Sequence, residues 1–491
     1  MIGCGSMGGG MALLFAEHGV HVSLEDPSEE AVQRVLEQGK QDGIGHMLEK
    51  HQDYADLCKS LGSPKIFVFS LPHGTVGDTV LGSLQPYLTK GDIIIDASNE
   101  NWQNTQRRQG KCVAMGIYYI GMGVSGGYQA ARRGPSMCPG GQDVPMNMIM
   151  PFLKKIAAKD PKGRPCVGKA GEGGSGHYVK MLHNGIEQGM MSAVAEAWHV
   201  MNASLDMEYE EISDVFSKWA AEGELKNTFL VNIAIDICRT KDKDGRYPLS
   251  YVQDKVVQET DDTEGTGIWS NEEAIRLHIP TPTLSTAYSF RVGSGDRAQR
   301  ERVKGAFGGD FPVEKISFRN DGEKESFLED LRLAVYEACL ASYVQGLIVI
   351  DKADRENNWS INFATVVQIW RGGCIIQADH IADMLEEIFK GPRAVKENGD
   401  RNLLYEPRIA EEFKRGFAAL KRIVSKGAET NAIIPSISAT LDYLKYQTSL
   451  DLPTQFYEAE LDYFGKHMFD LKSEPAGKPV TGKHHYEWKP A

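Results

Sequence analysis

The chain begins with a glycine-rich segment, Gly3-Cys4-Gly5-Ser6-Met7-Gly8, which fits the pattern G-x-G-x-x-G. In that pattern the first glycine permits a tight turn, the second lets a pyrophosphate approach the backbone, and the third allows close packing of a helix on a strand. A helical pattern over Met11–His18 and a strand pattern over Val20–Leu24 follow. Although a glycine-rich loop without a ligand is common, this order predicts the turn of a dinucleotide-binding fold, with the helix N-terminus facing the phosphates.

Three further apolar runs rich in β-branched or aromatic residues read as strands, at Ile66–Ser70, Ile93–Asp96 and Ile117–Ile120. Helical patterns separate the strands, which predicts a parallel, doubly wound sheet. A strand should also precede the glycine turn, and Met1-Ile2 supplies little of one. We therefore expect the sequence to be a truncated version of a longer protein.

The pattern changes near Gly173, where long helical periodicity replaces the strands, as in Gly176–Ala203 and Ser326–Lys352. From about Leu471 the chain is rich in Lys, Pro and Gly and has no core pattern. We predict an α/β Rossmann-type dinucleotide-binding domain over residues 1–172, a large all-α catalytic and dimerisation domain over 173–470, and an extended tail over 471–491.

Composition excludes several kinds of partner. The formal net charge of −13 argues against nucleic acid or an anionic membrane surface as the main partner. We find no apolar run that approaches the ~20 residues of a membrane span. The eight cysteines include no C-x-x-C pair, and no histidine cluster completes a zinc site. These features predict reduced, mostly buried cysteines in a cytoplasmic protein, and no metal.

Two acidic residues, Glu25 and Asp26, follow the second strand about 20 positions beyond the glycine turn. A carboxylate there can accept hydrogen bonds from the adenosine ribose hydroxyls, and it would repel a 2′-phosphate. The segment Asp26-Pro27-Ser28-Glu29 is also good capping chemistry for a helix N-terminus. Both interpretations can hold together, and the first favours NAD as the cofactor.

Four polar residues, Lys180, His183, Asn184 and Glu187, have the spacing i, i+3, i+4 and i+7. This spacing puts all four on one face of a helix. Lysine and glutamate are ordinary on a solvent-exposed helix face. Histidine and asparagine on the same face, with a glycine-rich segment before the helix, are less common there. Periodicity by itself still favours a surface helix.

The segment Gly176–Glu187, G-H-x-V-K-M-x-H-N-G-I-E, resembles the signature helix of the decarboxylating 6-phosphogluconate dehydrogenases. Other segments resemble that family in the same order along nearly the whole chain. They are DIIIDASN (92–99), GVSGG (123–127), GPSMCPGG (134–141), GTGIW (265–269), SFLEDLR (326–332), WRGGCII (370–376) and DYFGKH (462–467).

The resemblance implies oxidation and decarboxylation of 6-phosphogluconate to ribulose 5-phosphate and CO2, a step of the pentose phosphate pathway, with NADP as the family's usual cofactor. It also implies a homodimer whose active site is shared, because the tail reaches into the partner subunit. Lys180 would take the proton of the substrate's C3 hydroxyl, and Glu187 would protonate C1 of the enediol. Burial and neighbouring charge would have to lower the pKa of the lysine and raise that of the glutamate.

Matching family positions supply the remaining site residues. The implied contacts to the sugar acid are Asn99, Ser125, Gly126, Gly127, His183, Asn184, Thr266, Arg291 and His467, and the implied contacts to the cofactor are Gly3, Gly5, Ser6, Met7, Gly8, Glu25, Asp26, Leu71, Pro72, His73 and Asn99.

The sequence departs from the family where the substrate phosphate would bind. Gln188 replaces the usual tyrosine, Glu264 the usual lysine and Leu461 the usual arginine. Near the cofactor, Glu25-Asp26-Pro27 replaces the usual Asn-Arg-Thr that grips a 2′-phosphate, so we expect this member to prefer NAD.

These departures leave alternatives open. One is an NAD-dependent decarboxylating paralogue that acts on another aldonate, and another is a non-decarboxylating β-hydroxyacid dehydrogenase. A catalytically silent NAD-binding regulator is a third, although the intact Lys180 and Glu187 argue against it.

Overall fold

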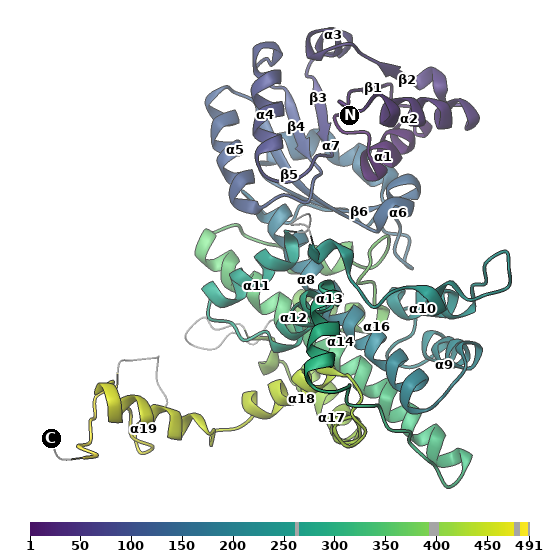
Figure 1. The fold of residues 1–491 in the computed structure, drawn as a ribbon. Helices are drawn as coiled ribbons and strands as arrows, with labels where there is room; N and C mark the ends of the chain where they lie inside the picture. Colours follow the sequence, from purple (N-terminus) through teal and green to yellow (C-terminus); the bar gives the residue numbers. More distant parts are fainter. Residues whose placement is uncertain (261–264, 392–401, 476–481, 490–491) are drawn as a thin grey trace. The chain divides into compact units, whose positions relative to one another are not determined.

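The computed structural model describes residues 1–260, 265–391, 402–475 and 482–489. The chain forms two compact units, Met1–Thr440 and Leu441–Ala491 (Figure 1). The first unit holds a sheet covered by helices and a larger, all-helical part. All eight cysteines are free and buried, as the sequence predicted.

Four strands of the first unit lie close to their predicted positions, whereas the strands at 48–50 and 136–140 were not predicted. The strands are β1 (Val22–Leu24), β2 (Leu48–Lys50), β3 (Ile66–Phe69), β4 (Ile93–Asp96), β5 (Tyr118–Ser125) and β6 (Ser136–Gly140). β1 pairs with β2, and β3 to β6 form a four-stranded sheet in sequence order. The first three pairings are parallel, but β6 runs antiparallel to β5, so the predicted parallel sheet is mixed at this edge.

One residue, Ile2, joins the two parts of the sheet. It forms parallel bridges to Glu25 after β1 and to Phe69 in β3. Its N–H donates to the carbonyl of Val68 and its carbonyl accepts from the N–H of Ser70, both at 2.9 Å. Ile2 therefore occupies the position of the central strand that the glycine turn requires.

Helices cover both faces of the sheet (Figure 1). They are α1 (Ser6–Glu17), α2 (Glu29–Gln41), α3 (Tyr54–Ser60), α4 (Thr75–Leu84), α5 (Trp102–Ala114), α6 (Gly127–Arg133) and α7 (Asp143–Ile156). Ile93 and Ile95 of β4 pack into one core with α1, α2 and α7, whereas Ile94 packs into the other with α3, α4 and α5. Because side chains alternate along a strand, a strand covered on both faces must be apolar throughout, which explains the consecutive isoleucines of β4.

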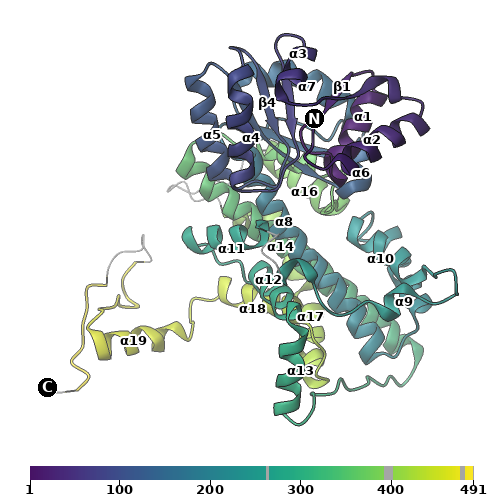
Figure 2. The ribbon, with the colours of Figure 1, turned by 45° about the horizontal axis from the view of Figure 1, so that its top comes forward.

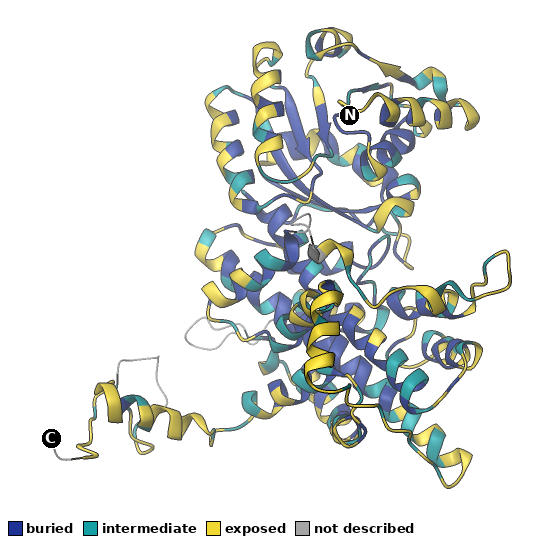
Figure 3. Cartoon of the chain, viewed as in Figure 1, coloured by how far each residue is buried: buried dark blue, intermediate teal, exposed yellow. Residues whose placement is uncertain are grey.

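The helical part of the chain is built around α8 and α14, which pack against each other and are mostly buried (Figures 2 and 3). Its helices are α8 (Ser175–His199), α9 (Tyr209–Ala221), α10 (Phe229–Arg239), α11 (Thr266–Arg276), α12 (Pro282–Gly295), α13 (Arg297–Ala306), α14 (Asp321–Asn357), α15 (Phe363–Ile369), α16 (Asp379–Lys390) and α17 (Pro407–Glu429). The boundary between the two units falls within α18 (Pro435–Gln447), and the second unit contains α19 (Thr454–Gly465).

By length and composition, α14 could cross a membrane, which the sequence analysis did not anticipate. However, 94% of its most apolar 18-residue window is buried inside the structure. Such burial is typical of the central helix of an all-helical core, which is apolar on every side.

The N-terminus of α8 lies directly on the sheet. A Cβ atom at Gly176 would come within 2.1 Å of the carbonyl oxygen of Gly121 in β5 and 2.5 Å of that of Cys138 in β6. The backbones of helix and strands are therefore in contact, and this contact fixes where the polar face of α8 lies relative to the ends of the strands.

We predict that Gly176→Ala destabilises the protein by about 1–3 kcal/mol or more, because the methyl group would meet rigid backbone atoms. Gly110→Ala in α5 is the matched control, since a Cβ there has no atom within 4 Å. Removing a helical glycine at that site should stabilise the protein by roughly 0.5–1 kcal/mol. Denaturant unfolding of both variants measures the difference, and equal stabilities would contradict the assigned contact.

Candidate active site

The three glycines of the N-terminal turn have three different surroundings. Gly3 has a φ of +94°, and a Cβ there would lie 2.1 Å from the carbonyl oxygen of Ser70. A Cβ at Gly8 would lie 2.0 Å from the carbonyl oxygen of Gly3, whereas Gly5 has open space around it. The turn therefore has the tight bend, the open approach and the close packing that the pattern requires.

The acidic residues after β1 have contacts of their own. One carboxylate oxygen of Asp26 accepts from the N–H of Cys4 at 2.6 Å, and the other accepts from the N–H of Ser28 at 2.7 Å. Ser28 is the N-cap of α2. Asp26 thus ties the glycine turn to the start of α2, which extends the capping interpretation, and burial raises the pKa of the neighbouring Glu25.

A cleft of about 480 Å³ lies between the strand ends of the sheet and the helical part of the first unit. It brings together predicted residues from seven separate segments. The predicted residues that line it are Met7, Leu71, Pro72, His73, Asn99, Ser125, Gly126, Gly127, Lys180, Asn184, Glu187, Thr266 and Arg291.

The polar face of α8 points into this cleft. Lys180, Asn184 and Glu187 all line it, so the prediction of a surface helix from periodicity alone is wrong. A Cβ at Gly123 would lie 2.4 Å from the Cβ of Lys180, and the glycine therefore leaves the space that the lysine occupies. The side chain of Glu187 is 25% exposed, and its carboxylate lies 3.6 Å from Nδ1 of His183.

His183 does not line the cleft but lies buried behind it. Asn184 donates through Nδ2 to Thr266, which leaves its Oδ1 to accept from Nδ1–H of His183 at 3.0 Å. Nε2 is then the acceptor, and the hydroxyl of Ser125 donates to it at 2.9 Å. Burial, reinforced by the charge of Lys180, holds the pKa of His183 well below its ordinary value, so a neutral ring fixes the orientation of Asn184 and Ser125.

Two residues of the site escaped the sequence analysis, although their segment was noted. The thiol of Cys374 lies 3.0 Å from Nε2 of His183, and Ile375 lines the cleft. Burial raises the pKa of Cys374 to about 12, which keeps this thiol protonated. A Cβ at Gly126 would lie 2.4 Å from the carbonyl oxygen of Gly373. The glycine pair of W-R-G-G-C was the available signal for this contact.

The positions near the expected phosphate have different outcomes. Gln188 lines the cleft and is buried, with its side-chain nitrogen 2.7 Å from the position of a Cβ at Gly267. Glu264 lies outside the described residues. Leu461 and His467 belong to the second unit. Thr266 and Arg291, which the resemblance assigns to the sugar acid, both line the cleft.

Two family models together match nearly the whole chain. The NAD binding domain of 6-phosphogluconate dehydrogenase matches residues 1–171, and the C-terminal domain of 6-phosphogluconate dehydrogenase matches residues 176–488.

Individual relatives agree with these matches. The chain is 42% identical to the decarboxylating 6-phosphogluconate dehydrogenase of Emericella nidulans, over 99% of this chain and 100% of the relative. It is 35% identical to decarboxylating 6-phosphogluconate dehydrogenase 1 of Oryza sativa, over 99% and 97%. It is also similar in structure to Plasmodium falciparum 6-phosphogluconate dehydrogenase, with a TM-score of 0.87, 30% identity and 99% coverage of both chains. The chain therefore belongs to the family of decarboxylating 6-phosphogluconate dehydrogenases.

Proposed function

We propose that the protein oxidises 6-phosphogluconate and decarboxylates it to ribulose 5-phosphate and CO2, with reduction of a nicotinamide dinucleotide. The observation that carries this proposal is the placement of Lys180 and Glu187 on one helical face inside a single cleft. The Plasmodium relative was solved with NADP+ and with 6-phosphogluconate. A base and an acid on the same wall suit a reaction that removes one proton and later adds another.

The proposed roles follow from the positions of the side chains. Lys180 takes the proton of the C3 hydroxyl as C3 becomes a ketone, and a bound nicotinamide supplies the hydride acceptor. The β-keto acid then loses CO2, and Glu187 donates a proton to C1 of the enediol. Ser125 and Asn184, fixed by the neutral His183, orient the sugar acid.

The residues near the distal end of the bound substrate suggest a second candidate substrate. Arg291 lines the cleft and suits a phosphate, because a guanidinium can donate two hydrogen bonds to it. Gln188 Oε1 is buried and has no hydrogen-bond partner among the described residues. A carbonyl acceptor suits a hydroxyl better than an ionised phosphate, which favours an aldonate without a phosphate as the second candidate.

For the cofactor, we propose a preference for NAD. Asp26 places a carboxylate beside the glycine turn, and Glu25 adds a second acidic group whose pKa is raised by burial. We therefore ascribe most of the repulsion of a 2′-phosphate to Asp26. A cleft of about 750 Å³ beside the same turn is lined by Arg34 of α2, which is the group to test if NADP is preferred.

We also propose a homodimer that shares its active sites, in which the second unit supplies His467. Asp462 is buried and accepts hydrogen bonds from the N–H groups of Met468 and Tyr486 and from the side chains of His485 and Trp488. These bonds fix the turn that contains His467. The unit's exposed aromatic side chains supply a surface for a second copy of the chain, and they are Phe456, Tyr457, Tyr463, Phe464, Tyr486 and Trp488.

The proposed compartment is the cytoplasm. The eight cysteines are free and buried, which suits a compartment that keeps thiols reduced.

We expect Lys180→Met to lose hydride transfer almost entirely, by about a thousandfold or more, because no other group is assigned to take the C3 proton. Glu187→Gln should also be strongly impaired, with the largest loss in protonation of the enediol. Simultaneous assays of reduced cofactor and CO2, with 6-phosphogluconate and with gluconate, measure both steps and separate the two candidate substrates.

Lys218→Met, at an exposed lysine of α9, is the control for loss of a lysine and should keep full activity. Full activity of Lys180→Met or Glu187→Gln would refute the catalytic assignment. Faster turnover of gluconate than of 6-phosphogluconate would replace the first candidate substrate with the second.

The cofactor proposal predicts that kcat/KM is about a hundredfold higher with NAD than with NADP, since each ~1.4 kcal/mol of repulsion or lost contact is a factor of ten. Asp26→Asn removes the charge while its amide oxygen keeps the bond from Cys4, at the cost of the bond from Ser28. It should raise the ratio of kcat/KM for NADP to kcat/KM for NAD. A higher kcat/KM with NADP in the unaltered protein would refute the preference, and loss of that activity in Arg34→Met would identify the responsible group.

Removal of the residues after Gly465 should abolish turnover and leave cofactor affinity in the first unit unchanged. His467→Gln should lower kcat/KM about tenfold or more, as expected for loss of one substrate hydrogen bond. His484→Gln is the matched control, since His484 lies in the same unit and bonds Glu474. Light scattering and cofactor titration measure assembly and binding, and a fully active monomer would contradict the proposed dimer.

A further inference from the structure

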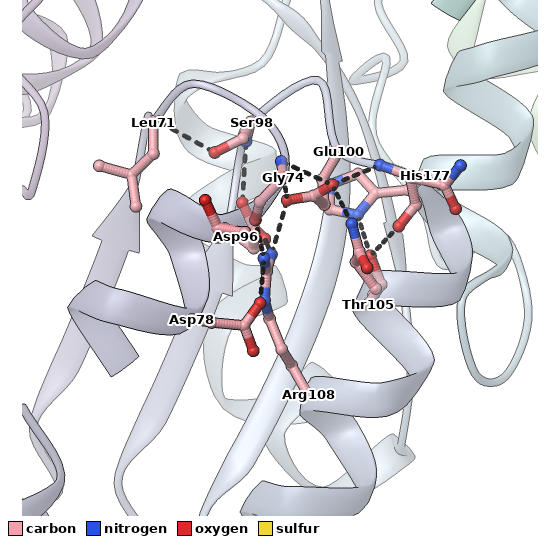
Figure 4. A network of polar contacts seen from close by, with 12 residues as sticks. Leu71, Gly74, Asp78, Asp96, Ser98, Glu100, Thr105, Arg108 and His177 are labelled. Atoms are coloured by element: carbon pink, nitrogen blue, oxygen red, sulfur yellow. Dashed lines mark hydrogen bonds and ion pairs between the residues drawn. The ribbon is translucent and has the colours of Figure 1, made fainter. Parts of the chain in front are cut away.

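Arg108 of α5 is a wholly buried arginine that has no place in the mechanism above. Its guanidinium donates through Nη1 to Glu100 at 2.7 Å, and through Nη2 to Asp78 at 3.0 Å and to the carbonyl oxygen of Gly74 (Figure 4). Asp96 lies 3.5 Å from the same guanidinium. One buried cation thus contacts three carboxylates and one backbone carbonyl.

These contacts join two loops. Gly74 ends the loop that follows β3, and Glu100 lies in the loop that follows β4. The carboxylate of Glu100 accepts from the N–H of Gly74 at 3.1 Å and from the N–H of Asn101 at 2.7 Å. Both backbone groups of Gly74 are therefore bound, its carbonyl by Arg108 and its N–H by the carboxylate that Arg108 holds.

The same two loops line the catalytic cleft. Leu71, Pro72 and His73 come from the first loop and Asn99 from the second. A further bond, from the N–H of Leu71 to Ser98 Oγ at 2.9 Å, ties the loops together on the side nearer the cleft (Figure 4). The distance between the loops thus depends on two links, one at each end of the Leu71–Gly74 segment.

The helix that holds Arg108 also contacts the catalytic helix. Thr105 Oγ1 of α5 lies 2.6 Å from Nδ1 of His177, which precedes Lys180 by one turn of α8 (Figure 4). Burial lowers the pKa of His177, so this contact is a bond between neutral groups. The position of α5 is therefore coupled both to the loops and to the helix that holds the proposed base.

The packing of α4 against the guanidinium of Arg108 restricts where this group can lie. A Cβ at Gly77 would lie 2.6 Å from Cζ of Arg108, so the first turn of α4 rests against the guanidinium without a side chain between them. Arginine donors have a fixed planar geometry that can span Gly74 and Glu100, whereas a lysine ammonium is a single compact group.

We infer that Arg108 is a positioning residue, which sets the spacing between the Leu71–Gly74 loop and the Ser98–Glu100 loop and so aligns cofactor and substrate for hydride transfer. The inference rests on the proposed function for its catalytic readout. Its binding readout does not, because the loops can be probed with the cofactor alone.

Arg108→Lys tests the inference with the charge retained, which avoids leaving three carboxylates without a buried cation. We expect the KM and the dissociation constant for the cofactor to rise about tenfold to a hundredfold, the effect typical of losing a group that orients a binding residue. A larger deuterium isotope effect from the C3 hydrogen should accompany this rise, because misalignment slows hydride transfer. Arg107→Met is the matched control, since Arg107 also bonds Asp78 but lies at the surface, and it should change these values less than about twofold.

A second comparison separates positioning from stability. Glu100→Gln should reproduce the cofactor effect, and the double variant Arg108→Lys, Glu100→Gln should be no worse than the poorer single variant, because both act through one link. Effects that multiply would overturn the inference. So would an Arg108→Lys protein in which melting temperature falls while cofactor affinity and isotope effect stay unchanged. Cofactor titration without substrate shows whether these variants change cofactor affinity, even if 6-phosphogluconate is not turned over by the unaltered protein.

Discussion

The contact between the backbone of α8 and the backbone of β5 and β6 is the constraint on which the site depends. Gly176 touches the carbonyl of Gly121 without a side chain between them, and Gly123 leaves room for Lys180. A single methyl group at the first contact would move the helix away from the sheet. Such a shift of the helix would also move Lys180, and a misplacement of about 1 Å is enough to slow catalysis.

The site is held by two polar networks of different kinds. Around His183 the groups are neutral, because the ring is buried next to Lys180 and its bonds run to Ser125 and Asn184. Around Arg108 the groups are charged, and they lie outside the cleft under the loops. A neutral network orients substrate contacts without adding charge beside the proposed base, whereas the charged network can be rigid because it is remote from the reacting atoms.

The glycine turn shows how one residue can serve both structure and selectivity. Asp26 accepts from Cys4 in the turn and from Ser28 at the start of α2, so it supports the loop that a dinucleotide would approach. The carboxylate that makes these hydrogen bonds also carries a negative charge beside the turn. Residues that hold such a turn therefore also set the electrostatic potential that a cofactor phosphate meets.

The sequence by itself determined the turn, most of the strands and the face of α8. Glycine spacing predicts the N-terminal turn because only glycine permits the φ of +94° at Gly3. The apolar run Ile93–Asp96 predicts a strand covered on both faces. The spacing from Lys180 to Glu187 predicts one helical face, although only the family motifs indicated that this face is not exposed to solvent. These signals are local, since they depend on residues within one or two turns of each other.

The tertiary structure decided everything that depends on long separations in the chain. Cys374 meets His183 across 191 residues, and β6 turns antiparallel to β5 at an edge where pairing, not local preference, sets direction. Arg108 lies within the polar run 103–109 of α5, and nothing local distinguishes it from the exposed Arg107. Burial separates the two arginines, and burial is a property of the packed chain, because it depends on which distant segments cover a side chain.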